Sequence, residues 1–271
     1  MEYNERMEEL LLKTKIIPPR VPDYTVNRNR LIHMLQSHID KKLILICANA
    51  GYGKTTLLTQ YIKNIRTPCL WYHIDSSDQD INLFVRYIIE GLQRHIPQFG
   101  ERTRALTRNA RQQEIKLEIL CGTLINELVE LSHEKILLIF DDLHEIYRIP
   151  KIISGFEYLL NNLPTNVSIV ASTRSALPFS LDRFQLKNEV WEIDQEDLKF
   201  TKDEITLLCE HLGGYTPKSL ELNKLRVDSE GWITCLQFLI QIHHTRFSIL
   251  VLLIFVLMIL QNLLYPLKHE K

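Results

Sequence analysis

The chain has 271 residues, which is enough for one large α/β domain with an ample core and a small appendix. Its 32 Lys and Arg residues nearly balance 33 Asp and Glu residues, which excludes a global field that would draw the protein to nucleic acid or to a membrane. Five scattered cysteines without metal-ligand spacing, and an N-terminus unlike a secretory leader, predict a cytoplasmic protein with reduced thiols.

Residues 1–40 are interpreted as an N-terminal lead. Three prolines favour an extended segment over residues 16–22, because each proline fixes φ and biases the preceding residue away from helix. Apolar residues between positions 31 and 35 predict a short helix at the end of this lead.

The most informative stretch is a loop of small residues between an apolar strand predicted over residues 43–47 and a helix predicted to end near residue 64. Gly51 and Gly53 can adopt backbone angles that a Cβ would forbid, so that the loop amides and the start of the helix point at an anion. Lys54 would reach the β- and γ-phosphates, and the Thr55 hydroxyl would bind Mg²⁺.

Ala48 stands where the usual pattern has its first glycine, at a position that needs a small residue more than it needs positive φ. A chance glycine-rich turn before a helix is the alternative, and the succession of strand, loop and helix disfavours it. The chain is therefore predicted to bind a nucleoside triphosphate through the loop residues Ala50, Gly51, Tyr52, Gly53, Lys54, Thr55 and Thr56.

Further apolar runs alternate with helical patterns, which predicts an α/β P-loop NTPase fold with a parallel five-stranded sheet between helices over residues 41–198. Residues 100–115 are basic and polar, and a solvated linker is favoured there over a nucleic-acid patch because no aromatic residues interleave. The strands are predicted at residues 43–47, 69–74, 136–140, 167–172 and 190–193, and the helices between them at 54–64, 81–95, 115–131 and around 156–163.

Asp141 and Asp142 follow the third predicted strand, and ligands of parallel sheets gather at the carboxyl ends of strands. Asp141 would hold Mg²⁺ through water, and Asp142 would orient the attacking water as general base. The pair would sit beside the Lys54 loop if the two strands are neighbours. The alternative is a turn with two solvated aspartates, which the upstream phosphate loop disfavours.

Other polar residues follow the strands. Arg174, just past the fourth strand, would place a guanidinium at the same edge, where it suits the γ-phosphate. Asp75 and Asp78 are interpreted either as acceptors for Mg²⁺-bound water or as helix caps, and Asp80 is favoured as the cap of the next helix. His144 is expected on a helix surface rather than as a ligand.

Residues 199–242 are predicted to form a small helical subdomain. Thr201 and Glu204 have the spacing of a capping box at the start of its first helix, which two glycines end at positions 213 and 214. Further helices are predicted from about residue 218 to 225 and from about 232 onward.

Residues 243–271 form an atypical apolar tail. No charged residue occurs from 247 to 267, a span long enough to cross a bilayer, although its densest part, 249–260, has the length of a buried helix. A membrane-spanning helix and a buried helix therefore both remain open for this segment.

Motifs from residue 14 to 242 carry a family resemblance, in segments 14–19, 25–31, 50–57, 71–75 with Asp78, 139–144, 172–174 with 177–178, 198–204 and 230–237. Together they resemble the N-terminal ATPase region of the large ATP-dependent LuxR-type transcriptional regulators, maltose-regulon activator type, which are STAND-class signalling NTPases. The resemblance implies binding of ATP or ADP with Mg²⁺ and self-association in the ATP state. It also implies that Val26 and Arg28 lie against the nucleotide base and that Arg174 senses the γ-phosphate.

The leading hypothesis is an ATP-binding signalling NTPase module of such a regulator, whose slow hydrolysis resets a switch. The family's helical sensor repeats and helix-turn-helix have no counterpart in this sequence, so we expect no sequence-specific DNA binding and interpret the tail as a truncation or frameshift product. The alternatives are a tail-anchored ATP-binding protein, associated with a membrane through residues 247–267, and a nucleotide-binding scaffold without turnover.

Overall fold

The computed structural model describes residues 11–109 and 115–244. The apolar segment 247–267 lies outside these residues. Among the helices that the structure describes, none combines the length and the apolar character needed to cross a bilayer.

The chain divides into two compact units, which we call the sheet unit and the helical unit. Of the described residues, the sheet unit comprises 11–20, 34–47, 61–109 and 115–193, and the helical unit comprises 21–33, 48–60 and 194–244. The phosphate loop predicted from the sequence therefore groups with the helical unit, although it leaves the end of a strand of the sheet.

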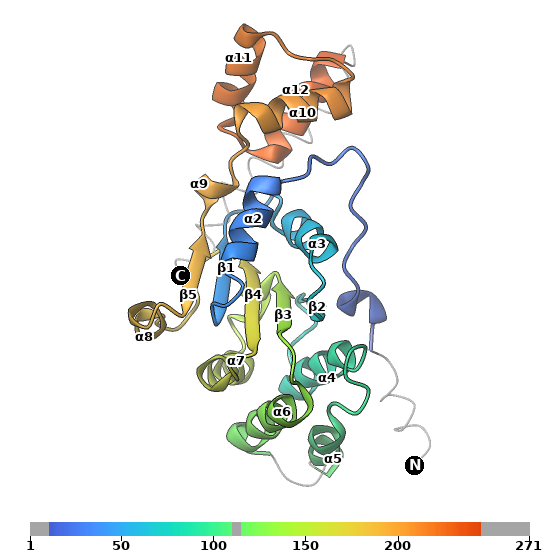
Figure 1. Ribbon diagram of the computed structural model, residues 1–271, viewed down its shortest axis with the longest axis vertical. Helices are drawn as coiled ribbons and strands as arrows, with labels where there is room; N and C mark the ends of the chain where they lie inside the picture. The colour runs from blue at the N-terminus through green and yellow to red at the C-terminus, as the bar shows by residue number, and fades with distance from the viewer. Residues whose placement is uncertain (1–10, 110–114, 245–271) are drawn as a thin grey trace. The chain divides into compact units, whose positions relative to one another are not determined.

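The sheet unit is built on five parallel strands in the order β2-β3-β4-β1-β5 (Figure 1). Long runs of apolar residues explain this sheet, because parallel strands are covered on both faces. Every residue of β3 and β4 is buried. The predicted α/β fold with a parallel five-stranded sheet is confirmed. The strands are β1 (Leu43–Cys47), β2 (Cys69–His73), β3 (Ile136–Asp141), β4 (Val167–Thr173) and β5 (Val190–Ile193).

Helices flank the sheet, and their apolar faces form one core with it. Tyr72, Phe84 and Phe140 form an aromatic cluster at its centre, with ring centroids 5.5–6.2 Å apart. Asp80 caps its helix as predicted, since its carboxylate accepts the backbone N–H groups of Asn82 and Leu83. The helices of this unit are η2 (Lys13–Ile16), α4 (Ile81–Leu92), α5 (Glu101–Asn109), α6 (Leu117–Leu131), η4 (Leu143–Ile146), α7 (Pro150–Asn162) and α8 (Asp182–Leu186).

The interpretation of residues 100–115 as a solvated linker was wrong, because residues 101–109 form helix α5. Its basic side chains pair with acids of neighbouring helices: Arg102 with Glu130 at 2.6 Å and Arg104 with Glu90 at 2.7 Å. The buried Glu127 carboxylate of α6 accepts the backbone N–H of Arg102, which has no acceptor within the first turn of α5. A polar composition therefore concealed a helix whose partners lie elsewhere in the chain.

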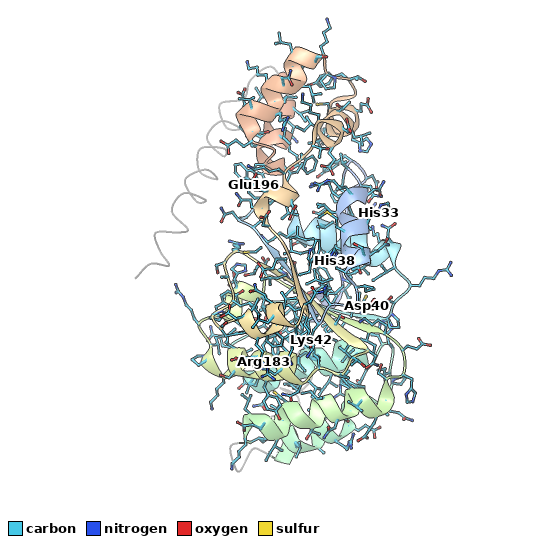
Figure 2. All side chains as sticks on the ribbon, turned by 60° about the vertical axis from the view of Figure 1, so that its left-hand side comes forward. His33, His38, Asp40, Lys42, Arg183 and Glu196 are labelled. Atoms are coloured by element: carbon cyan, nitrogen blue, oxygen red, sulfur yellow. The ribbon has the colours of Figure 1, made fainter. Side chains whose placement is uncertain are left out.

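The stretch that leads into β1 is held against β5 by a ring stack. The rings of His38 and Trp191 are parallel, with centroids 3.9 Å apart. Lys42, at the end of this stretch, pairs with Glu189 at 3.5 Å (Figure 2 labels His38 and Lys42). These contacts fix β1, the strand from which the phosphate loop departs.

The helical unit has its own core, made by apolar residues of the N-terminal lead and of the C-terminal helices, among them Val26, Phe200, Leu208 and Leu236. The predicted capping box is confirmed: Glu204 N–H donates to the Thr201 hydroxyl, and Thr201 N–H donates to the Glu204 carboxylate. The helices that lie in this unit or begin in it are α2 (Asn29–Ser37), α3 (Lys54–Asn64), α9 (Gln195–Leu198), α10 (Lys202–Gly213), α11 (Ser219–Ser229) and α12 (Ile233–His244).

Candidate functional site

The loop before α3 has the geometry of a phosphate-binding loop. Gly51 and Gly53 have φ values of 77° and 79°, in the region that a Cβ disfavours. Helix α3 begins at Lys54, whose ammonium donates to the carbonyls of Ala48 at 2.7 Å and Asn49 at 3.0 Å. Thr55 occupies the first turn of the same helix. A helix N-terminus, two glycine turns and a lysine thus converge on one loop.

Two side chains at the start of α12 hold the loop from its other side. Trp232 Nε1–H donates to the Ala50 carbonyl at 3.2 Å, and the Thr234 hydroxyl donates to the Gly51 carbonyl at 3.0 Å. A Cβ on Gly51 would overlap the Thr234 hydroxyl and lie 2.7 Å from Trp232 Nε1. The ring of Tyr52 stacks on Trp232 with centroids 6.3 Å apart. Glycine at position 51 is therefore needed both for its φ and for close approach.

The sequence did not predict this role of Trp232 and Thr234, which enter there only through the resembling motif at residues 230–237. More than 180 positions separate them from the loop residues that they contact, and no local spacing rule relates such distant segments. The one local feature that could have pointed to this contact is that Trp232 and Thr234 place two side-chain donors within three residues.

A pocket of about 270 Å³ opens next to the loop within the helical unit. It brings together five of the predicted nucleotide-binding residues, namely Val26, Arg28, Gly51, Gly53 and Thr56. Apolar residues make much of its remaining wall, namely Leu57 of α3, Phe200 just before α10, Leu208 of α10 and Ile233 of α12. An apolar pocket beside a phosphate loop has the character that a flat heterocycle requires.

Arg28 lines this pocket, and its guanidinium is held by partners inside the helical unit. Its Nε–H donates to Glu204 at 2.8 Å, its Nη2 donates to the carbonyl of Leu198 at 3.1 Å, and the group lies 4.1 Å from the Phe200 ring centroid. Burial lowers the pKa of Arg28, and the charge of Glu204 opposes that shift. The backbone N–H of Arg28 donates to the Gln60 side chain, which ties the lead to α3.

The predicted acidic pair lies in the sheet unit at the carboxyl end of β3. Asp141 is fully buried, and its Oδ1 accepts the Ser172 hydroxyl at 2.6 Å while its Oδ2 lies 3.3 Å from His73 Nδ1. Asp142 adopts a left-handed conformation with φ 60°, and its N–H donates to the Ser172 hydroxyl at 2.9 Å. Such strain in a non-glycine residue is typical of functional sites.

The strand that carries the acidic pair is not the neighbour of the strand that precedes the loop, because β4 lies between β3 and β1. The condition stated for the acidic pair, that its strand neighbours the strand before the Lys54 loop, is therefore not met. Arg174 follows β4 directly, so its backbone comes from this intervening strand. Its assignment to the γ-phosphate stays a prediction.

His144 was expected on a helix surface, and this was wrong. It lies on the 3-10 helix η4 with its side chain only 4% exposed, and its Nδ1 is 3.7 Å from the Asp142 carboxylate. The tight turn of η4 folds the imidazole back beside the acidic pair, which a pattern drawn for an ordinary amphipathic helix does not anticipate.

Asp75 and Asp78 both bind Lys15, and neither caps α4, whose cap is Asp80. Their role as acceptors for Mg²⁺-bound water stays a prediction. The Lys15 ammonium lies 2.8 Å from Asp75 and 2.7 Å from Asp78. The Tyr72 hydroxyl donates to the second oxygen of Asp78 at 2.8 Å. Burial raises the pKa of Asp75, but hydrogen bonds from Lys15 and Ser77 outweigh it and lower that pKa to about 2.

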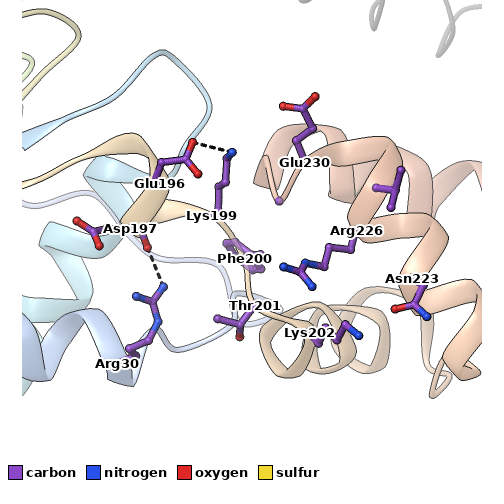
Figure 3. A pocket seen from close by; sticks show the side chains of 12 residues that line it. Arg30, Glu196, Asp197, Lys199, Phe200, Thr201, Lys202, Asn223, Arg226 and Glu230 are labelled. Carbon is purple, nitrogen blue, oxygen red and sulfur yellow. Dashed lines mark hydrogen bonds and ion pairs between the residues drawn. The ribbon is translucent and has the colours of Figure 1, made fainter.

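A second and larger pocket of about 920 Å³ lies in the helical unit between the α9–α10 turn and α11 (Figure 3). Its charges are mixed, and some are already paired: Lys199 contacts Glu196 at 2.7 Å, and Arg30 donates to the Asp197 carbonyl at 2.7 Å. Lys202, Arg226 and Glu230 also line it. This mixture of signs selects no ligand class.

Comparison with solved structures identifies the fold. The chain matches the Walker-type ATPase of Pyrococcus abyssi with a TM-score of 0.59 and 14% identity, over 93% of this chain and 79% of that one. It also matches the Aeropyrum pernix ORC1 protein in complex with DNA, with a TM-score of 0.46 and 12% identity, over 83% of this chain and 60% of that one. The fold is thus that of a P-loop ATPase.

The family model described as "Nephrocystin 3, N-terminal" matches residues 24–174, which is more than half of the 271 residues. The match includes part of the lead, the phosphate loop, the acidic pair and Arg174. The chain therefore belongs to the Nephrocystin 3 N-terminal family.

Proposed function

We propose that the chain is a nucleotide-binding NTPase module that binds ATP or ADP with Mg²⁺ and hydrolyses ATP slowly as a switch. The observation that carries the proposal is the loop with two left-handed glycines and Lys54, next to a pocket that the same glycines line. A loop of this shape suits the phosphates of a nucleotide, and an adjoining apolar pocket suits its base.

The residues present fit a magnesium nucleotide. The Lys54 ammonium carries the positive charge for the β- and γ-phosphates, and the Thr55 hydroxyl at the start of α3 is an oxygen donor of the kind that Mg²⁺ prefers. Asp141 is a buried carboxylate whose orientation Ser172 fixes. In this proposal Thr55 and Asp141 hold the ion, which neutralises phosphate charge when bound.

Turnover is assigned to the residues next to Asp141. Asp142 would accept a proton from the attacking water, and Arg174 would contact the γ-phosphate, where a planar guanidinium makes bidentate hydrogen bonds. Val26 and Arg28 would lie against the base. The contacts of Arg28 with Glu204 and Phe200 support a role in shaping the pocket wall, since its guanidinium already has partners.

A finer proposal is that this module belongs to a LuxR-type regulator and self-associates in its ATP state. The support is that Trp232 and Thr234, which belong to one of the resembling motifs, contact the phosphate loop. A nucleotide that changes the backbone of the loop would therefore change the hydrogen bonds of Trp232 and Thr234 at the start of α12. Light scattering of the full chain with and without ATP tests self-association, and an unchanged mass would contradict this finer proposal.

The nucleotide proposal is tested by the affinity of Lys54→Ala for Mg²⁺–ATP in a calorimetric titration. Loss of a charge-assisted phosphate contact, about 1.5–3 kcal/mol, should weaken binding at least about tenfold. Lys63→Ala, an exposed lysine at the other end of α3, is the matched control and should bind as the parent does. Equal affinity of parent and folded Lys54→Ala would refute the assigned loop.

A further inference from the structure

Three donor groups meet at the edge of the sheet unit where β2 and β3 end. His73 and Asp141 are the last residues of these strands and stand opposite each other in the parallel register. Together with Asp142 they each offer one donor atom, and these three atoms lie within 4.8 Å of one another. The site thus contains one imidazole nitrogen and two carboxylates, from the ends of two adjacent strands and from the residue that follows β3.

The Asp141 carboxylate is held in one orientation. Its Oδ1 accepts the Ser172 hydroxyl at 2.6 Å, and its Oδ2 is hydrogen-bonded to His73 Nδ1 at 3.3 Å, a contact that a bound ion would replace. In an octahedral site with ligands at about 2.1 Å, adjacent donors lie about 3.0 Å apart. The separation of Oδ2 and Nδ1 is close to that of two neighbouring ligands of one ion.

His73 also has the access that a ligand needs. Its side chain is 44% exposed, whereas Asp141 beneath it is fully buried. The Asp142 carboxylate is partly exposed, and the hydrogen bond from its N–H to Ser172 connects it to the same network. An ion would therefore approach the site from the exposed sides of His73 and Asp142.

We propose that His73 gives this cation site a nitrogen donor, so that it binds Mn²⁺ and similar first-row transition ions in preference to Mg²⁺. Imidazole is a poor ligand for Mg²⁺ and a good one for transition ions, while Mn²⁺ accepts nitrogen and carboxylate together. The inference rests on the proposed role of Asp141 as a cation ligand. The three donors His73, Asp141 and Asp142 all belong to the sheet unit, so their binding of an ion can be tested without nucleotide and without Thr55.

The test titrates the full chain with manganese chloride and follows free and bound Mn²⁺ by electron paramagnetic resonance, with Mg²⁺ as competitor. Bound Mn²⁺ should show the coupling of a directly bonded nitrogen-14 nucleus in spin-echo spectra. His73→Gln, which keeps a polar group of similar size, should lose that coupling and reduce the preference for Mn²⁺ over Mg²⁺ about tenfold or more. Asp141→Asn should abolish binding.

His133→Ala is the matched control, because His133 is an exposed histidine that precedes β3 at the opposite edge of the sheet. It should leave both the coupling and the preference unchanged. His73→Ala serves as a second variant and should behave as His73→Gln does.

Bound Mn²⁺ without nitrogen coupling, absence of Mn²⁺ binding, or an unchanged preference in both folded His73 variants would each overturn the proposal. The Lys54→Ala variant separates this outcome from failure of the nucleotide function. It should keep the nucleotide-free Mn²⁺ signal in full, because Lys54 is not one of the three donors. Failure of the parent to bind ATP with that signal intact would refute the nucleotide function alone.

Discussion

The phosphate loop and the acidic edge of β3 are built in different ways. The loop gets its shape from two glycines and from side chains that grip its carbonyls, namely Lys54, Trp232 and Thr234. The acidic edge gets its shape from residues of adjoining strands, in which Ser172 and His73 fix the two oxygens of Asp141. One site is held by segments distant in sequence, and the other by the register of a sheet.

This difference predicts different responses to substitution. A change in the loop alters the backbone on which phosphates would rest, so it should affect binding. Replacement of Asp142 at the acidic edge leaves the strands in place and removes the proposed base, so it should affect turnover. The contrast requires that loop substitutions change ATP affinity and that Asp142 substitutions change the rate of hydrolysis.

The largest effect is expected at the acidic edge. Asp142→Asn removes the proposed general base and keeps the size of the side chain, so ATP hydrolysis should slow about hundredfold while ATP affinity is retained. Phosphate release and calorimetric binding measure the two quantities on the same preparation. Asp182→Asn, an exposed aspartate at the start of α8, is the control. Hydrolysis at the parent's rate would show that another group is the base, and the proposed division between binding at the loop and turnover at Asp142 would fail.

The next effect belongs to the loop. Gly51→Ala adds the strain of positive φ, about 1–2 kcal/mol, and an overlap with Thr234, so ATP affinity should fall more than tenfold. Gly214→Ala makes the comparison sharp, because Gly214 also has positive φ, at 63°, but no atom lies within 4 Å of the added Cβ. It should lower the melting temperature slightly and leave affinity alone. Equal losses of affinity in both variants would mean that strain, not the grip of Thr234, matters.

The smallest effect concerns the acids after β2. The pKa of Asp75 is lowered from 3.8 to about 2, so its pairing with Lys15 stabilises the fold fully above pH 4 and is lost as pH falls through 2. The side chain is 43% exposed, so the contribution should stay below about 1 kcal/mol. Urea unfolding of the parent and Asp75→Asn between pH 5 and 2 measures it. The difference in unfolding free energy should shrink toward acid pH; a constant difference would contradict the pairing.

Much of the sheet unit was predictable because its signals are local. The bounds of β1 and β5 agree with the prediction, since each strand is a short apolar run between polar residues. The caps at Asp80 and Thr201 were also predictable, because capping depends on spacing of two or three residues. The residues of the loop and the acidic pair were recognisable for the same reason.

Contacts between distant segments were not predictable. Nothing local indicates that Lys15 binds Asp78, that Arg28 binds Glu204, or that β4 separates β3 from β1. His144 was misjudged because a 3-10 turn, not an amphipathic helix, carries it. These features depend on how strands and helices pack, which a single sequence encodes only through the complete fold.

The hydrogen bonds between α12 and the loop carry a consequence for the order of events during synthesis. The loop residues Ala50 and Gly51 leave the ribosome about 180 positions before Trp232 and Thr234, the side chains that fix their carbonyls. Domains acquire their long-range contacts only after both segments have emerged. The phosphate loop therefore lacks its hydrogen bonds from Trp232 and Thr234 while all five strands of the sheet are being synthesised. It can gain both bonds only after residue 234 has been translated.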